Sequence, residues 1–367
     1  MDFCDLAVDG VRRLSPYQPG KPISELQREI GIQDVVKLAS NENPLGPSPL
    51  AVDAARDALA QLARYPDGGG FDLKAALALR HGVDQSCITL GNGSNDVLDM
   101  VARAFLGPGR SAVFSEHAFA VYPIATQAVG ASARIAPAKN HGHDLQAMAA
   151  AVAEDTRVVF IANPNNPTGG WLGSAELEGF LGELPGNVIC VVDEAYFEYV
   201  DRPDYPDSSQ WLERFENLIV CRTFSKAYGL AGLRVGYSLC GPAIADLLNR
   251  VRQPFNNNSI ALAAAEAALG DREHLQQAIA LNRDGMALYE RAFTEMGLDW
   301  IPSVGNFVCV RLDRPGTEVY RALLGLGVIT RPVANYGLPN HLRISIGTLA
   351  ENQRCVDALR TILDKSP

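Results

Sequence analysis

The stretch Thr223-Phe-Ser-Lys-Ala-Tyr-Gly-Leu-Ala-Gly-Leu-Arg-Val-Gly-Tyr237 decides the fold, because apolar runs lead into it and out of it. The first run, Leu218–Cys221, is short and continuous, which predicts a buried strand. Lys226 follows the end of that strand, where an ammonium group is costly unless it has an anionic partner or a chemical role. An apolar pocket favours the neutral amine, the nucleophilic form that makes a Schiff base. The alternative is a lysine whose aliphatic stem lies along apolar surface.

Two further apolar runs also end in polar residues. Val158–Ala162 leads into Asn163-Pro-Asn-Asn-Pro-Thr-Gly169, and Val188–Val192 is followed by Asp193, with Tyr196 three residues later. Open parallel sheets bind ligands at the carboxyl ends of their strands. An aspartate after one strand and a lysine after the next suit a pyridine cofactor, because the acid keeps the ring nitrogen protonated while the amine bonds the cofactor's aldehyde.

Composition and charge exclude several classes of function. The 367 residues, 47% hydrophobic and 20% charged, are typical of a globular protein with a large core and two domains. A net charge of −10 without a basic run argues against nucleic-acid binding. We expect no membrane span, since no apolar stretch approaches about 18 residues.

The N-terminus and the cysteines predict a cytoplasmic protein. Met1–Asp5 lacks the positive and apolar regions of a signal peptide. The seven cysteines are scattered and odd in number, which indicates reduced thiols. His141 and His143 have no cysteine or carboxylate partners at metal-binding spacing, so we expect a solvated loop there and no metal site.

Strands alternate with helical patterns through most of the chain, which predicts an α/β fold with a mainly parallel sheet covered by helices. We expect an N-terminal arm over 1–40, a large domain over 41–260 and a smaller C-terminal α/β domain over 261–367. The predicted strands of the large domain include Ser132–Ala136, Val158–Ala162, Val188–Val192, Leu218–Arg222 and Leu233–Cys240. Those of the small domain are Asn306–Arg311, Val328–Arg331 and Leu342–Ile346.

A glycine turn between a strand and a helix offers a phosphate site. Ile88–Leu98 has this pattern, with Gly93 at the turn and Ser94 and Asn95 at the helix start. The first amides of a helix have no partners within it and carry the positive end of its dipole, so they bind anions.

Three ordered motifs resemble those of the pyridoxal-phosphate-dependent aminotransferases of fold type I, and most of all the histidinol-phosphate aminotransferases. They are Asn163–Gly169, Val191–Tyr199 and Thr223–Tyr237, and the resemblance extends from Leu14 to Gly347. It implies the fold type I transferase fold, pyridoxal 5′-phosphate as cofactor, and a homodimer with shared active sites.

The resemblance also implies roles for residues around the cofactor. Lys226 bonds the cofactor and moves a proton, and Asp193 pairs with the ring nitrogen. Asn166 and Tyr196 contact the 3-oxygen, whereas Ser225 and Arg234 join Gly93, Ser94 and Asn95 at the phosphate. Phe119 stacks on the ring, at a position where histidinol-phosphate enzymes usually carry tyrosine, and Tyr65 reaches the phosphate of the neighbouring subunit. Phe119 as core packing and Tyr65 as a surface tyrosine are the alternatives.

Four residues are implied at the substrate: Tyr17, Asn43, Arg331 and Arg343, with Asn41 a weaker candidate. The Arg343 position binds the anionic group of the substrate, either a carboxylate or a phosphate, and an arginine pair serves both. The predicted reaction is transamination between histidinol phosphate (or imidazole-acetol phosphate) and 2-oxoglutarate or glutamate, in histidine biosynthesis. The alternatives are an aromatic amino-acid aminotransferase, a decarboxylase of a phosphorylated amino acid, and a cofactor-binding regulator without turnover.

Overall fold

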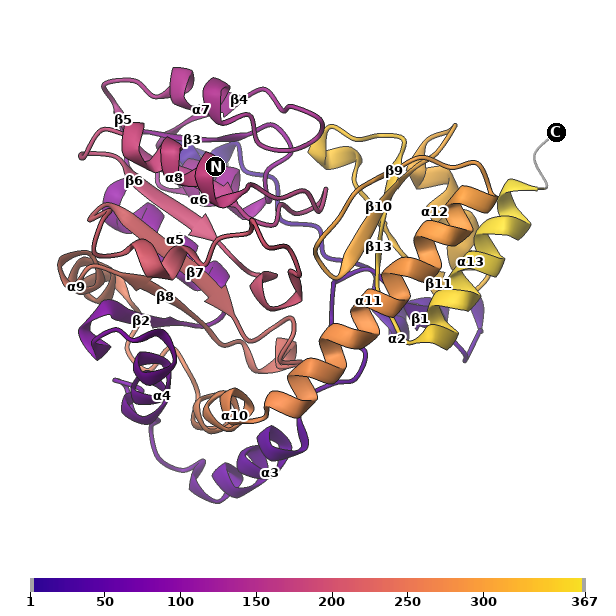
Figure 1. Ribbon diagram of the computed structural model, residues 1–367, viewed down its shortest axis with the longest axis horizontal. Helices are drawn as coiled ribbons and strands as arrows, with labels where there is room; N and C mark the ends of the chain where they lie inside the picture. The colour runs from indigo at the N-terminus through magenta and orange to yellow at the C-terminus, as the bar shows by residue number, and fades with distance from the viewer. Residues whose placement is uncertain (1–2, 365–367) are drawn as a thin grey trace.

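The computed structural model describes residues 3–364, which contain a seven-stranded sheet, a four-stranded sheet and a two-stranded sheet (Figure 1). In the large sheet of seven strands, five adjacent strands pair in parallel with one another. Its order is β2 (Ile88–Gly91), β8 (Gly236–Cys240), β7 (Leu218–Thr223), β6 (Ile189–Asp193), β5 (Thr156–Ala162), β3 (Ser111–Ser115) and β4 (Ser132–Ala136). β8 runs antiparallel to both of its neighbours, β2 and β7, and the other six strands run in one direction, so the predicted mainly parallel sheet is confirmed.

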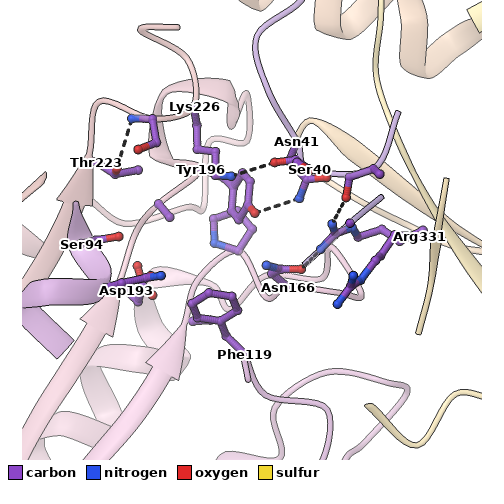
Figure 2. Close-up of a pocket in the computed structure, with 18 of the residues that line it drawn as sticks. Ser40, Asn41, Ser94, Phe119, Asn166, Asp193, Tyr196, Thr223, Lys226 and Arg331 are labelled. Carbon is purple, nitrogen blue, oxygen red and sulfur yellow. Dashed lines mark hydrogen bonds between the residues drawn. The ribbon is translucent and has the colours of Figure 1, made fainter. Parts of the chain in front are cut away.

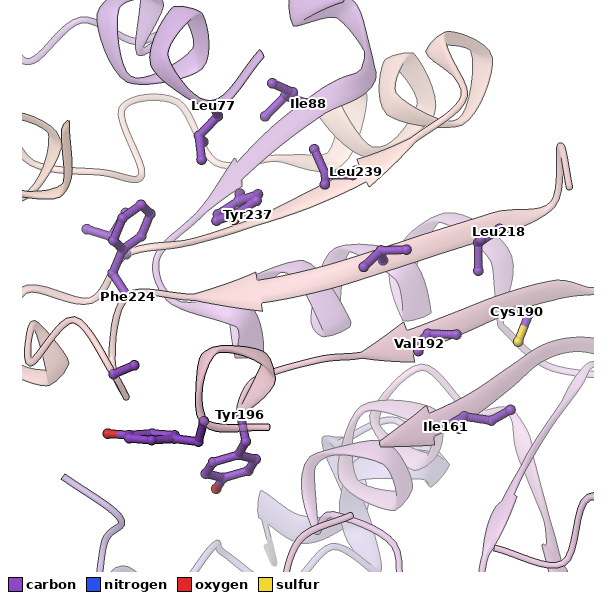
Figure 3. Packing of buried hydrophobic residues seen from close by; sticks show 14 of the residues in the cluster. Leu77, Ile88, Ile161, Cys190, Val192, Tyr196, Leu218, Phe224, Tyr237 and Leu239 are labelled. Carbon is purple, nitrogen blue, oxygen red and sulfur yellow. The ribbon is translucent and has the colours of Figure 1, made fainter. Parts of the chain in front are cut away.

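Both faces of the large sheet are buried, which is why its strands are continuous apolar runs. Along β5, Val158 and Phe160 pack into one hydrophobic cluster, while Val159 and Ile161 pack into the other. Figure 3 shows side chains of the second of these clusters projecting from successive strands. The first face is covered by α5 (Ser94–Phe105), α6 (Val121–Ala128) and α9 (Pro242–Val251). The second is covered by α4 (Phe71–His81), α7 (Leu145–Ala151), α8 (Ser174–Glu183) and α10 (Ser259–Gly270).

The smaller sheet is antiparallel and has its own core. Its order is β12 (Arg331–Pro332), β13 (His341–Ser345), β10 (Phe307–Arg311) and β9 (Trp300–Ile301). It packs with α11 (Arg272–Glu295), α12 (Gly316–Gly325) and α13 (Leu349–Leu363). The long α11 spans between the two parts of the molecule (Figure 1).

The N-terminal arm packs with the smaller sheet. It contains α1 (Asp9–Arg12) and α2 (Ile23–Ile30), and β1 (Val36–Lys37) pairs in parallel with β11 (Val328–Ile329). Leu26 of α2 is buried against Ile329. The arm then enters α3 (Pro49–Ala58), whose N-terminus is capped by the Ser48 hydroxyl accepting from the amide of Ala51 at 3.1 Å. The domain boundaries stay a prediction: α10, beyond residue 260, contributes Ala261, Ala264 and Ala265 to the large-sheet core.

Two of the expectations concern membrane spans and metal sites. Among residues 3–364, no helix is long and apolar enough to cross a membrane. Within the same range, no three or more histidine, cysteine or acidic side chains are grouped so that they could hold a metal ion. His143, which we expected in a solvated loop, is instead buried, with its Nε2 atom 2.8 Å from the carbonyl oxygen of Ala162.

Candidate active site

A cavity of about 180 Å³ lies where β5, β6 and β7 end, and the N-terminal arm and the smaller sheet complete its wall (Figure 2). Parallel strands bring their carboxyl ends to one edge of a sheet, so residues far apart in sequence meet there. The predicted residues that line it are Tyr17, Asn41, Ser94, Asn95, Phe119, Asn166, Asp193, Tyr196, Ser225, Lys226, Arg234, Arg331 and Arg343. The structure therefore brings most of the candidate residues into a single cavity.

Asp193 is the acid at the bottom of this cavity. It is the last residue of β6 and only 5% exposed. The hydroxyl of Tyr122, from α6, donates to its Oδ2 atom at 3.0 Å, and within residues 3–364 its Oδ1 atom has no hydrogen-bond partner. Burial raises the pKa of Asp193 to about 6, while the Tyr122 hydrogen bond acts in the opposite direction.

Lys226 lies in the loop after β7, the strand next to β6. Its ammonium group donates to the carbonyl oxygen of Ser40 at 3.1 Å and lies 5.6 Å from the centre of the Tyr196 ring. Burial, and to a smaller extent the positive charge of Arg343, lower the pKa of Lys226 to about 8. The neutral amine is thus accessible near physiological pH, as a nucleophilic lysine requires.

A group of donors at the start of α5 forms an anion site. Ser94 is the first residue of the helix, Asn95 is the next, and both line the cavity. Across from them, the guanidinium of Arg234 donates to the Ser225 hydroxyl at 3.2 Å. Gly93 has a φ of +84°, and a Cβ there would lie 2.4 Å from the Nη2 atom of Arg234, so only glycine lets the arginine approach the helix start.

Asn166 and Tyr196 are held by hydrogen bonds from outside the large sheet. Arg343, on β13, donates to the Oδ1 atom of Asn166 at 2.5 Å. The side-chain amide of Asn41, in the arm, donates to the Tyr196 hydroxyl at 2.9 Å. Burial raises the pKa of Tyr196 to about 12, so this hydroxyl keeps its proton and can also donate.

The predicted substrate residues are divided between the cavity and its surroundings. Tyr17 and Arg331 line the cavity, with the guanidinium 5.8 Å from the ring centre. Asn43 is buried but is not among the lining residues, because its amide donates to the carbonyl oxygen of Ala227 at 2.9 Å. Tyr65 also lies outside: it is 83% exposed and stacks on Phe255 with ring centres 4.8 Å apart.

Three residues at the site were not among the predicted site residues. Ser40 and Thr223 line the cavity, and Tyr122, which does not line it, donates a hydrogen bond to Asp193. Thr223 closes the turn before the lysine by accepting from the amide of Ser225 at 3.1 Å. Thr223 was inside a quoted motif, but the contact of Tyr122 depends on how α6 packs on the sheet and has no local signal.

A family model described as aminotransferase class I and II matches residues 33–359. The chain belongs to the aminotransferase class I and II family. The aminotransferase is 60% identical to histidinol-phosphate aminotransferase 2 of Pseudomonas fluorescens over 367 residues, which is 100% of this chain and 99% of the relative. It is 61% identical to histidinol-phosphate aminotransferase 2 of Pseudomonas aeruginosa, covering 99% of both chains.

A solved structure agrees with the sequence relatives. Histidinol-phosphate aminotransferase from Sinorhizobium meliloti, in complex with pyridoxal-5′-phosphate, matches with a TM-score of 0.87 at 29% identity, over 96% of this chain and 97% of that one. The predicted family and fold are confirmed. The roles of individual site residues stay predictions.

Proposed function

We propose that the aminotransferase uses pyridoxal 5′-phosphate to move an amino group between histidinol phosphate (or imidazole-acetol phosphate) and 2-oxoglutarate or glutamate, a reaction of histidine biosynthesis. The observation that carries the proposal is the placement of one amine and one buried acid, Lys226 and Asp193, at neighbouring strand ends of the same cavity. The identity of about 60% to histidinol-phosphate aminotransferases over the full length supports the substrate.

The residues of the cavity fit this cofactor. Asp193 has a buried Oδ1 atom without a partner among residues 3–364, which suits the protonated nitrogen of a pyridine ring. The donors around Gly93 and Arg234 suit a phosphate dianion, because a rigid guanidinium fork and helix amides both favour that charge. Phe119 supplies an aromatic face to the same cavity.

When bound, the cofactor supplies an electron sink for the carbon that carries the amino group. The chain supplies the rest. Asp193 balances the positive charge of the ring nitrogen, and Tyr196 and Asn166 contact the 3-oxygen. Lys226 is the general acid and base that moves a proton during the transfer, and its lowered pKa suits that role near neutral pH.

Two arginines suit the anionic end of the substrate. Arg343 is buried, and within residues 3–364 its Nε atom has no hydrogen-bond partner. Arg331 lines the cavity beside Tyr17, and one of its Nη atoms donates to the carbonyl oxygen of Gln18 at 2.7 Å. A phosphorylated substrate carries up to two negative charges, so it gains from a pair of guanidinium groups more than a single carboxylate does.

The proposal includes a cytoplasmic homodimer in which Tyr65 completes the active site of the partner. Its support is the position of Tyr65 on the surface, outside the cavity of its own chain. An exposed tyrosine stacked on a second half-exposed aromatic ring, Phe255, is typical of a surface that another chain covers.

One assay tests the substrate. Purified protein is offered histidinol phosphate, phenylalanine and threonine phosphate separately, each with 2-oxoglutarate, and glutamate and carbon dioxide are both measured. We expect glutamate formation with kcat/KM for histidinol phosphate well above that for phenylalanine, and no carbon dioxide. A preference for phenylalanine identifies an aromatic aminotransferase, carbon dioxide from threonine phosphate identifies a decarboxylase, and no product from any of them identifies a regulator.

A further inference from the structure

Tyr122 contacts residues that line the cavity but does not line the cavity itself. The side chain is fully buried in α6, and its hydroxyl donates to the Oδ2 atom of Asp193 at 3.0 Å. Its ring lies parallel to that of Phe160, with centres 4.9 Å apart and planes inclined by 6°. The ring of Phe119 lies nearly perpendicular to that of Tyr122, with centres 5.9 Å apart and planes inclined by 86°. Stacking on the β5 side chain therefore fixes where the hydroxyl lies.

The hydrogen bond from the Tyr122 hydroxyl makes the two oxygens of the Asp193 carboxylate different from each other. Tyr122 engages Oδ2, and within residues 3–364 the buried Oδ1 has no hydrogen-bond partner. Burial holds the pKa of Tyr122 well above its usual value, so the hydroxyl is a donor at every working pH. A donor on one oxygen leaves the other as the acceptor for a protonated ligand, and it prevents rotation of the carboxylate.

The hydroxyl also acts on the charge of the acid. Burial raises the pKa of Asp193, and the neighbouring Glu194 raises it further, while Tyr122, the backbone amide of Ala195 and the amine of Lys226 lower it. The other titratable groups around the pair are Tyr196 and Cys221. Without the hydroxyl, the carboxylate is lost at a higher pH, closer to neutrality.

We propose that Tyr122 is a positioning residue, which through its hydroxyl orients the Asp193 carboxylate toward the ring nitrogen of the cofactor. The inference rests on the proposed function, because it assumes that the ligand of Asp193 is pyridoxal phosphate. The effect of Tyr122 on cofactor binding is then specific to one atom of the cofactor, the ring nitrogen. A residue that only fills the core would stabilise binding of any ligand of the same shape.

The test uses that atom. Apoprotein is titrated with pyridoxal phosphate and with its 1-deaza analogue, in which carbon replaces the ring nitrogen, for wild type and for Tyr122→Phe. Tyr289→Phe is the matched control, because Tyr289 is also fully buried but lies in the core of the smaller sheet. Thermal melting of each apoprotein confirms that the variants are folded.

The deciding quantity is the ratio of the affinity for pyridoxal phosphate to the affinity for the analogue. We expect Tyr122→Phe to lower the preference for pyridoxal phosphate over the analogue by about tenfold near neutral pH, as for loss of a hydrogen bond to a charged group. The loss should be smaller at about pH 9, where Asp193 is ionised in both proteins. Tyr289→Phe should leave the ratio unchanged.

Two failures are distinguishable. If wild type prefers pyridoxal phosphate and Tyr122→Phe keeps the same ratio, or loses affinity for both compounds equally, the role of Tyr122 is overturned while the proposed function stands. If wild type itself does not distinguish the two compounds, the pairing of Asp193 with the ring nitrogen is wrong, and the inference fails with it.

Discussion

The Nη1 atom of Arg343 lies 2.5 Å from the Oδ1 atom of Asn166, and this hydrogen bond joins the smaller sheet to the loop after β5. A second Nη atom of Arg343 donates to the carbonyl oxygen of Ala39 in the arm at 2.6 Å. All three parts of the molecule thus meet at one guanidinium group in the cavity wall. The group is held in place before any anion arrives, which reduces the entropy lost on binding.

Replacing Arg343 by alanine should therefore weaken the anionic substrate. We expect KM for histidinol phosphate to rise by about 10- to 100-fold, as for loss of a charge-assisted hydrogen bond, with a smaller change in kcat. Arg343→Lys should restore little, because an ammonium group lacks the planar fork. Arg311→Ala, an exposed arginine on the adjacent β10, is the control. An unchanged KM in Arg343→Ala would move the anion site elsewhere.

Asp193→Asn should make the apoprotein more stable and less able to bind its cofactor. The folded pKa of about 6 lies above the ordinary aspartate value of 3.8, so the folded state binds the proton more tightly and stability falls as pH rises through that window. At about pH 8 the variant should gain about 2–3 kcal/mol of unfolding free energy, since one pKa unit is worth about 1.4 kcal/mol. Denaturant unfolding measures this gain.

The gain should disappear when the same unfolding experiment is repeated at about pH 4, where the acid is protonated in the folded protein. The exposed Asp201, replaced by asparagine, provides the control. Equal stability of Asp193→Asn and wild type at both pH values would show that the buried carboxylate carries no cost.

Cofactor uptake by the apoprotein should increase with pH. The pKa of Lys226 is lowered to about 8, chiefly by burial, so the neutral amine becomes the major form above that pH rather than above the ordinary lysine value of 10.5. The rate of pyridoxal phosphate binding, followed by visible absorbance, should rise with a midpoint near pH 8. Arg343→Ala removes a positive charge that lowers this pKa, so its midpoint should lie higher. A midpoint unmoved by that substitution would contradict the electrostatic account.

Mixed dimers test the shared active site. If Tyr65 acts in the active site of the partner, a homodimer of either single variant, Tyr65→Phe or Lys226→Ala, has two impaired active sites. In a mixed dimer, one site combines the intact lysine of one chain with the intact tyrosine of the other. Unfolding and refolding the two variants together should therefore restore activity at about a quarter of the sites. No recovery above the sum of the separate variants would place Tyr65 outside the partner's site.

The sequence predicted the parts of the site that depend on local pattern. The buried runs before Asp193 and Lys226 specify strands, and the edge at which parallel strands end then brings both residues together. Gly93 and the start of α5 were likewise recognisable, because a glycine turn and a helix start are adjacent in sequence.

Contacts between distant elements could not be predicted in this way. Tyr122 and Asp193 are 71 positions apart, and their hydrogen bond depends on the packing of α6 on Phe160. Asn43 shows the opposite case. The family resemblance implied it at the substrate, but whether its amide faced the cavity or the backbone of Ala227 depended on the path of the arm across the sheet.

The most direct test of the account is reduction of the protein with borohydride after loading with pyridoxal phosphate, followed by peptide mass mapping. The account predicts a visible absorbance band that disappears on reduction, and a single modified residue, Lys226. In Asp193→Asn the same residue should be labelled, at a higher cofactor concentration. Labelling of another lysine, or no label at Lys226 in wild type, would contradict the claim that this amine and this acid bind opposite sides of one cofactor ring.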